Sequence, residues 1–102
     1  MPRSGDVRFT QWFDSYVKGS SKIRVTHNRD GVPHLAQGIV GFVHVTHEIF
    51  YKGAMNEGFV SCNDLPTRED LGCSDRNLNN RTLTDHLNYY DLDFTNMILG
   101  CQ

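Results

Sequence analysis

The chain of 102 residues carries 10 Lys and Arg against 12 Asp and Glu, which gives a formal net charge of −2. This near neutrality excludes the strong positive field of a general nucleic-acid coat protein. The apolar fraction of 38% and the charged fraction of 22% are ordinary for a globular protein. A chain of this length forms one folding unit, so we expect a single domain over residues 1–102.

Charge is unevenly distributed along the chain. Residues 1–29 hold six cations and two carboxylates, and the remainder holds four cations and ten carboxylates, so the two parts carry +4 and −6. Opposite ends of this kind suit a contact between two copies. The three cysteines, Cys62, Cys73 and Cys101, form no CxxC pair, so the sequence predicts reduced thiols, and neither a disulfide framework nor a zinc ribbon. No leader and no membrane-spanning stretch are evident, and we therefore expect a soluble, intracellular, cytoplasmic protein.

An amphipathic helix is predicted over residues 7–18. Asp6 is its N-cap and Gly19 its terminator. Its apolar stripe has helical spacing and consists of Phe9, Trp12, Phe13, Tyr16 and Val17. We expect this stripe to face the core, so that truncating Trp12 would destabilise the fold. The alternative is that the stripe binds a partner or stacks on bases.

Strands follow the helix. Residues 22–27 alternate apolar and polar side chains, and Asn28-Arg-Asp-Gly31 predicts a hairpin turn into an edge segment, residues 32–37, that contains Pro33. Residues 38–51 have β-branched or aromatic side chains on both faces, which predicts one long central strand with Phe42 in the core. Residues 59–62 are expected to pair back against it.

The second half of the chain is predicted to be less regular. We expect a helix of one or two turns over residues 64–72, a loop over 73–81, a helix from Thr82 or Thr84 to Tyr90, and a strand over 94–99. The fold class is therefore α+β: a small, largely antiparallel sheet of three to five strands with an N-terminal helix and one or two C-terminal helices.

No recognisable catalytic arrangement stands out. His44 and His47 are three residues apart and would point to opposite faces of a strand, so we predict no metal site. The cysteines lack a strand-to-helix elbow, and GxGxxG, P-loop and HExxH motifs are absent from the sequence. The sequence therefore predicts no catalytic residue, no metal and no cofactor.

Two short segments resemble known families. Gly31-Val-Pro-His34, followed by Val43, Val45, Phe50 and Gly53, resembles part of a double-stranded-RNA-binding domain, which implies a loop that enters an RNA minor groove. Residues 56–64 hold no cation where that family has phosphate-binding lysines. His44-Val-Thr46, leading through Tyr51 to Asn56-Glu-Gly-Phe59, is similar to ADP-ribosyltransferases and implies use of NAD.

The interpretation we favour is a small non-enzymatic binding or regulatory protein, such as the accessory and inhibitor proteins of viruses and phages. It would form a homodimer and bind a protein partner, and no membrane partner is expected. The alternatives are RNA binding through residues 1–34 and an NAD-using transferase fragment. The residues predicted to bind are Trp12, Tyr16, Arg24, Arg29, His34 and His44.

Overall fold

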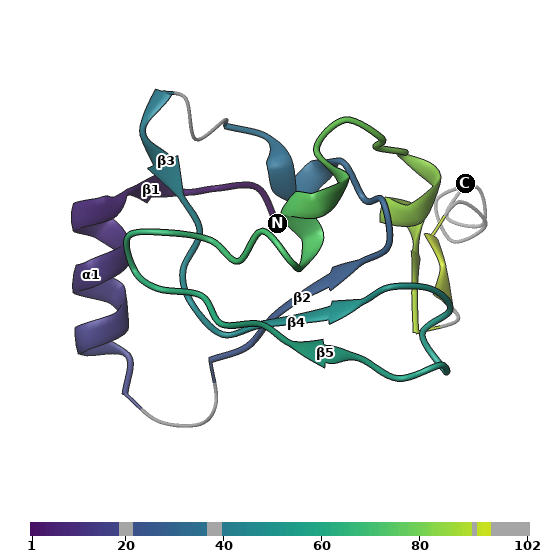
Figure 1. The fold of residues 1–102 in the computed structure, drawn as a ribbon, viewed down its shortest axis with the longest axis horizontal. Coiled ribbons are helices and arrows are strands. Elements are labelled where there is room, and N and C mark those ends of the chain that lie inside the picture. Colours follow the sequence, from purple (N-terminus) through teal and green to yellow (C-terminus); the bar gives the residue numbers. More distant parts are fainter. Residues whose placement is uncertain (19–21, 37–39, 91, 95–102) are drawn as a thin grey trace, which may run out of the picture.

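The computed structural model describes residues 1–18, 22–36, 40–90 and 92–94. These residues form one α-helix and several short strands, and the fold is broadly α+β, as predicted (Figure 1). The elements in chain order are β1 (Gly5–Asp6), α1 (Val7–Tyr16), β2 (Arg24–His27), η1 (Val32–His34), β3 (Phe42–Val43), β4 (Glu48–Tyr51), β5 (Val60–Ser61), η3 (Ser74–Asn77), η4 (Thr84–Leu87), β6 (Asn88–Tyr89) and β7 (Leu92–Asp93), where η denotes a 3-10 helix.

The central sheet has the strand order β2-β4-β5. Strands β2 and β4 run parallel, with Arg24 opposite Glu48 and His27 opposite Tyr51. Strand β5 is antiparallel to β4, which confirms the predicted pairing of residues 59–62 against the strand before them. In Figure 1, α1 lies at one end of the molecule and the C-terminal strands lie at the other, with this sheet between them.

The predicted long strand over residues 38–51 is wrong. Strands β3 and β4 belong to different sheets, β3 pairing with β1, and residues 37–39 lie outside the described ranges. Gly41 and His47 have positive φ angles of 86° and 69°, which an extended strand cannot contain. The Glu69 carboxylate accepts the His44 N–H at 3.0 Å, in place of a neighbouring strand.

The predicted hairpin around Asp30-Gly31 is also wrong. After β2 the chain turns into η1 instead of returning as a second strand, and β2 takes its partner from β4. The Asp30 carboxylate accepts the Val32 N–H at 2.9 Å, which closes the turn locally. Two parallel neighbouring strands require a long connection between them, and turn signals in the local sequence do not predict such a connection.

The N-terminal helix is confirmed over Val7–Tyr16, two residues shorter than predicted, and its predicted terminator Gly19 lies outside the described residues. The predicted burial of its apolar stripe is wrong for Trp12 and Tyr16. The Asp6 side chain accepts the Phe9 N–H at 3.0 Å, and this hydrogen bond lowers the pKa of Asp6. Trp12 and Tyr16 are 54% and 75% exposed, and Phe42 is 37% exposed. Since none of the three lies in a core, the large losses of stability expected from truncating Trp12 or Phe42 no longer have a structural basis.

The remaining C-terminal predictions are met only in part. Residues 64–72 form turns with a bridge between Leu65 and Arg68 and contain no helix, because the Asp64 side chain is taken up by buried hydrogen bonds. The predicted loop 73–81 contains η3, and the predicted helix up to Tyr90 is the short η4 followed by β6. The predicted strand 94–99 lies, beyond Phe94, outside the described residues.

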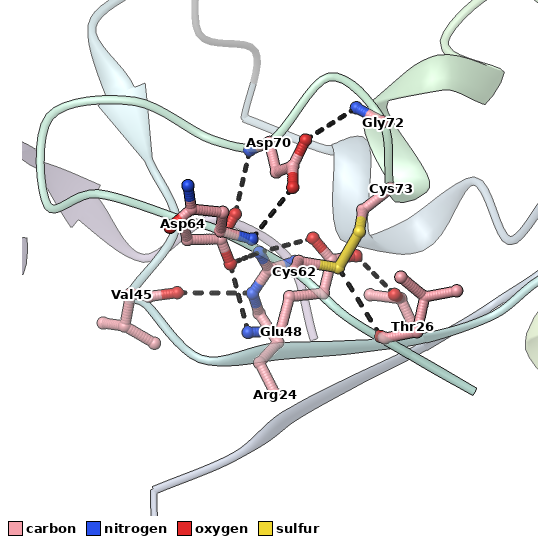
Figure 2. Close-up of a disulfide and its surroundings, with 11 residues drawn as sticks. Arg24, Thr26, Val45, Glu48, Cys62, Asp64, Asp70, Gly72 and Cys73 are labelled. Carbon is pink, nitrogen blue, oxygen red and sulfur yellow. Dashed lines mark hydrogen bonds and ion pairs between the residues drawn. A yellow bond between two sulfur atoms is a disulfide. The ribbon is translucent and has the colours of Figure 1, made fainter.

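The centre of the molecule is polar and charged. Arg24 donates to Glu48 at 3.0 Å and to Asp64 at 3.2 Å, and all three side chains are almost fully buried (Figure 2). Thr26 donates to the other oxygen of Glu48. This network connects β2 to β4 and to the segment after β5.

A disulfide between Cys62 and Cys73 lies beside this network (Figure 2). The prediction of reduced, unpaired thiols is therefore wrong for these two cysteines, and Cys101 lies outside the described residues. The disulfide attaches the end of β5 to the start of η3. None of the helices in the described ranges has the length and apolar character needed to cross a bilayer.

Replacing Cys62 and Cys73 by Ser together should lower the free energy of unfolding by about 2–4 kcal/mol, because the bond restricts the unfolded chain. Thermal melts with and without reductant measure this. Reductant should lower the melting temperature of the wild type toward that of the double variant and leave the variant unchanged. Equal melting temperatures for oxidised and reduced wild type would contradict the structural role of the bond.

Stability should fall as the pH falls. Burial and the nearby charge of Arg24 lower the pKa of His44 from 6.5 to about 4. Burial alone would raise the pKa of Glu69, but hydrogen bonds from Arg3 and from the His44 N–H lower it from 4.5 to about 2. Both groups bind protons more readily in the unfolded chain, so stability present above each unfolded pKa is lost as the pH falls toward the folded value.

The contribution of His44 can be isolated with His44→Gln, whose amide can still donate to the Pro33 carbonyl that His44 Nε2 contacts at 2.6 Å. Melting temperatures measured between the two pKa values of His44, 6.5 and about 4, should fall less steeply in this variant than in the wild type. Identical slopes would mean that other groups cause the acid sensitivity.

Candidate active site

Asp30 lies just beyond the carboxyl end of β2 and is almost completely buried. Its carboxylate accepts three hydrogen bonds: from the Val32 N–H at 2.9 Å, from His86 Nδ1 at 3.0 Å and from the Tyr89 hydroxyl at 2.6 Å. These three donors come from the turn itself, from His86 and from Tyr89, and together they fix the orientation of the carboxylate. The structure thus holds a carboxylate at a fixed position in the interior.

Backbone hydrogen bonds bring the C-terminal segment to this carboxylate. The Thr82 N–H donates to the Arg29 carbonyl at 2.7 Å, and the Gly31 N–H donates to the Thr82 carbonyl at 3.1 Å, so Asp30 and Thr82 form a parallel bridge. The short helix η4 follows soon after Thr82 and places His86 against Asp30. The site therefore depends on pairing between segments more than fifty residues apart.

His86 has the geometry of a general base. Because the Asp30 carboxylate is an acceptor, Nδ1 must carry the proton, and this leaves a lone pair on Nε2. The side chain of Asp30 is 2% exposed and that of His86 is 35% exposed, so the pair runs from the interior to the surface. Among the residues that the structure describes, Nε2 has no hydrogen-bond partner.

Tyr89 adds a second fixed donor to Asp30. Burial and the hydrogen bond to Asp30 raise the pKa of the Tyr89 hydroxyl above its usual range, so it remains a donor at physiological pH. Its ring also packs edge-on against His27, whose Nε2 contacts the Gly53 carbonyl at 2.9 Å. These contacts keep Asp30 oriented toward His86.

A pocket of about 450 Å³ opens beside the pair. Its walls are mostly apolar, and it is lined by Met1, Val25, Asp30, His86, Leu87, Tyr89 and Phe94. An apolar pocket with a few convergent polar groups is the usual form of a small-molecule site. Val25, Leu87 and Phe94 belong to the apolar lining of this pocket, and Asp30, His86 and Tyr89 are its polar groups.

The described residues bring together one group of side chains that could hold a metal ion: Glu48, Cys62 and Cys73. The two sulfur atoms are bonded to each other, so they are not thiolate ligands. Both oxygens of Glu48 are already occupied by Thr26 and Arg24.

The binding residues predicted from sequence do not form one site. Trp12 and Tyr16 stack on each other on α1, 5.4 Å between ring centroids. Arg24 is buried in its ion pairs within the sheet. Buried contacts also hold His34, beside Asp75, and His44, on the Pro33 carbonyl.

Arg29 is the one of these residues that lies next to the candidate site. Its backbone N–H donates to Asp85 Oδ2 at 3.2 Å, and its Nε lies 3.8 Å from the same oxygen. The sequence predicts Asp30 as part of a turn and places His86 in the helix expected to end at Tyr90, so neither is predicted as a site residue. One signal could have drawn attention to Asp30, because catalytic residues often follow the carboxyl end of a strand.

The sequence is similar to lipases. It is 34% identical to a lipase of Caenorhabditis elegans across 90% of this chain and 34% of that protein. A lipase of Rhizopus niveus is 28% identical across 90% of this chain and 22% of that protein. The chain thus spans about a third or less of the length of these curated relatives. No protein-family model matches the sequence.

Solved structures agree with the sequence comparison. Lipase II from Rhizopus niveus matches with a TM-score of 0.77 and 29% identity, over 90% of this chain and 33% of that chain. The propeptide complex of Rhizomucor miehei lipase matches with a TM-score of 0.75 and 29% identity, over 90% of this chain and 28% of that chain. The described elements therefore have the fold of part of a lipase.

These similarities correct the functional interpretation. The interpretation as a non-enzymatic accessory or regulatory protein, such as those of viruses and phages, is wrong, because the relatives and the structural neighbours are enzymes. The RNA-binding and NAD-transferase alternatives are wrong because these relatives and neighbours are lipases. The Gly31–His34 segment that resembled an RNA-binding loop forms η1 and its N-cap residue Gly31, with Pro33 and His34 buried.

Tyr89→Phe should lower the free energy of unfolding by about 1–3 kcal/mol, because it removes a donor from the buried Asp30 carboxylate. Tyr16→Phe is the matched control, since it removes a hydroxyl from a side chain that is 75% exposed. Urea unfolding curves compare the two variants. Equal stabilities would mean that the Tyr89 hydroxyl does not support Asp30.

Proposed function

We propose that this chain supplies the carboxylate, Asp30, and the general base, His86, of a serine-type ester hydrolase with lipase activity. The observation that carries the proposal is the contact between His86 Nδ1 and Asp30 Oδ2 at 3.0 Å, with Asp30 buried and Nε2 of His86 directed away from it. This arrangement of a carboxylate and an imidazole activates a hydroxyl nucleophile in hydrolases of several unrelated folds. The similarity to lipases supports the same chemistry.

Each group has a defined role. Nε2 of His86 takes the proton from a nucleophilic hydroxyl as its oxygen attacks the ester carbonyl, and the resulting imidazolium is stabilised by Asp30. The imidazolium then returns the proton to the departing alcohol. A water molecule then takes the place of the hydroxyl nucleophile, the same proton transfers are repeated, and the carboxylic acid is released. The described residues bring no hydroxyl group to Nε2, so the nucleophile comes from outside them.

The pocket beside His86 supports an apolar substrate. Its apolar walls include Val25, Leu87 and Phe94, and its polar groups are concentrated at Asp30, His86 and Tyr89. An ester with a hydrocarbon chain on the acyl or the alcohol side matches this distribution. We propose esters of fatty acids as the substrate class.

The compartment we propose is an oxidising one, in place of the cytoplasm expected from the sequence. The Cys62–Cys73 disulfide is the reason, because such bonds persist in secreted proteins and are rare in reducing compartments. Dimer formation stays a prediction, which light scattering tests by reporting one or two chain masses.

Asp30→Asn should lower kcat for ester hydrolysis by a factor on the order of 10⁴, because the amide no longer holds the productive tautomer of His86 or stabilises its charge. His86→Ala should lower it at least as far. The assay uses p-nitrophenyl esters of short and long acids and an emulsified triacylglycerol. It is run on the protein expressed from its natural coding sequence.

A control and an independent measurement accompany this assay. His47→Asn changes an exposed histidine with a positive φ of 69°, which Asn tolerates, and should leave hydrolysis unchanged. Nitrogen NMR of this chain should find the proton of neutral His86 on Nδ1. Wild-type hydrolysis that survives in Asp30→Asn and His86→Ala would overturn the proposal.

A further inference from the structure

The loop before the candidate base contains the sequence Asn80-Arg81-Thr82. Asn80 is the only asparagine of the chain that is followed two positions later by Ser or Thr, and the residue between them is not Pro. This is the acceptor sequence for N-linked glycosylation in secreted proteins. We propose that Asn80 carries an N-linked oligosaccharide.

The structure leaves the Asn80 side chain accessible. It is exposed, in a turn closed by the hydrogen bond from its N–H to the Asn77 carbonyl at 2.9 Å. Within the described ranges its side chain makes one hydrogen bond, which Arg29 Nη1 donates to Oδ1 at 3.4 Å on the exposed surface. In the described part of the chain no acceptor lies within hydrogen-bond distance of Nδ2, so a substituent on Nδ2 displaces no contact.

The disulfide is the second, independent observation. N-linked oligosaccharides are attached in the oxidising secretory compartment in which disulfides form, and Cys62 and Cys73 are bonded. The inference therefore depends on the proposed compartment. It does not depend on the proposed hydrolase chemistry.

The donor in this transfer would be a lipid-diphosphate-linked oligosaccharide. A bond forms between Nδ2 of Asn80 and C1 of the first sugar, and the bond between C1 and the phosphate oxygen breaks. The lipid diphosphate leaves with that electron pair, and Nδ2 releases one proton to water. No oxidation or reduction takes place.

The glycan would begin beside the candidate active site without replacing any of its contacts. Thr82, two residues later, forms the backbone pairing with Arg29 and Gly31 that positions Asp30. Its Oγ1 donates to Asp85 Oδ2 at 2.8 Å. Among the described residues, Asn80 forms no hydrogen bond with Asp30 or His86. Removing the glycan should therefore leave the Asp30–His86 pair intact.

The test uses the protein expressed from its natural coding sequence through the secretory pathway of insect cells. An N-glycosidase should increase its electrophoretic mobility, and peptide mass spectrometry should locate the sugar on Asn80. Asn80→Gln should migrate like the enzyme-treated protein. Asn79→Gln, an exposed neighbour outside the acceptor sequence, should keep the glycan.

The ester hydrolysis assay, applied to the same preparations, separates this inference from the proposed function. Asn80→Gln should keep wild-type kcat within a factor of about two, whereas Asp30→Asn should keep the glycan and lose activity. Secreted, disulfide-bonded wild type with an unmodified Asn80 peptide would overturn the inference, whatever its activity. If Asn80→Gln is not secreted, peptide mass spectrometry of the wild-type protein decides by itself whether Asn80 carries the glycan.

Discussion

The buried ion pairs of Arg24 with Glu48 and Asp64 are the interaction on which the rest of the structure depends. Arg24 and Glu48 are opposite each other in the parallel pairing of β2 with β4, and Asp64 follows β5. Three charges removed from water are stable only together, because deleting one partner leaves an uncompensated buried charge at a cost of about 3–5 kcal/mol. The network therefore determines which strands pair and in which register (Figure 2).

That register determines where β2 ends, and the candidate active site begins there. His27 closes the strand and Asp30 follows in the turn, where the backbone pairing with Thr82 brings η4 and His86 into place. The Cys62–Cys73 disulfide joins the end of β5 to η3, on the segment that leads to Thr82. The charge network, the disulfide and the Asp30–His86 pair are thus linked through consecutive contacts in the fold.

Polar and charged side chains make up most of the buried positions in the described part of the chain. Several large apolar side chains, including Trp12 and Tyr16, are exposed. Asp30 belongs to this polar interior: its buried carboxylate accepts three hydrogen bonds, one of them from His86, which reaches the surface. Buried polar groups of this kind are stable because they are hydrogen-bonded or paired.

Local sequence signals determined the elements that depend on neighbouring residues: Asp6 capping α1 through the Phe9 N–H, and residues 59–62 turning back against the preceding strand. These contacts join residues that are close in the sequence, so local sequence patterns predict them. Only the tertiary structure decided the parallel pairing of β2 with β4, the break at His47, the disulfide, and the meeting of Asp30 with His86. Each depends on contacts between distant segments, and a residue's type does not specify its distant partner.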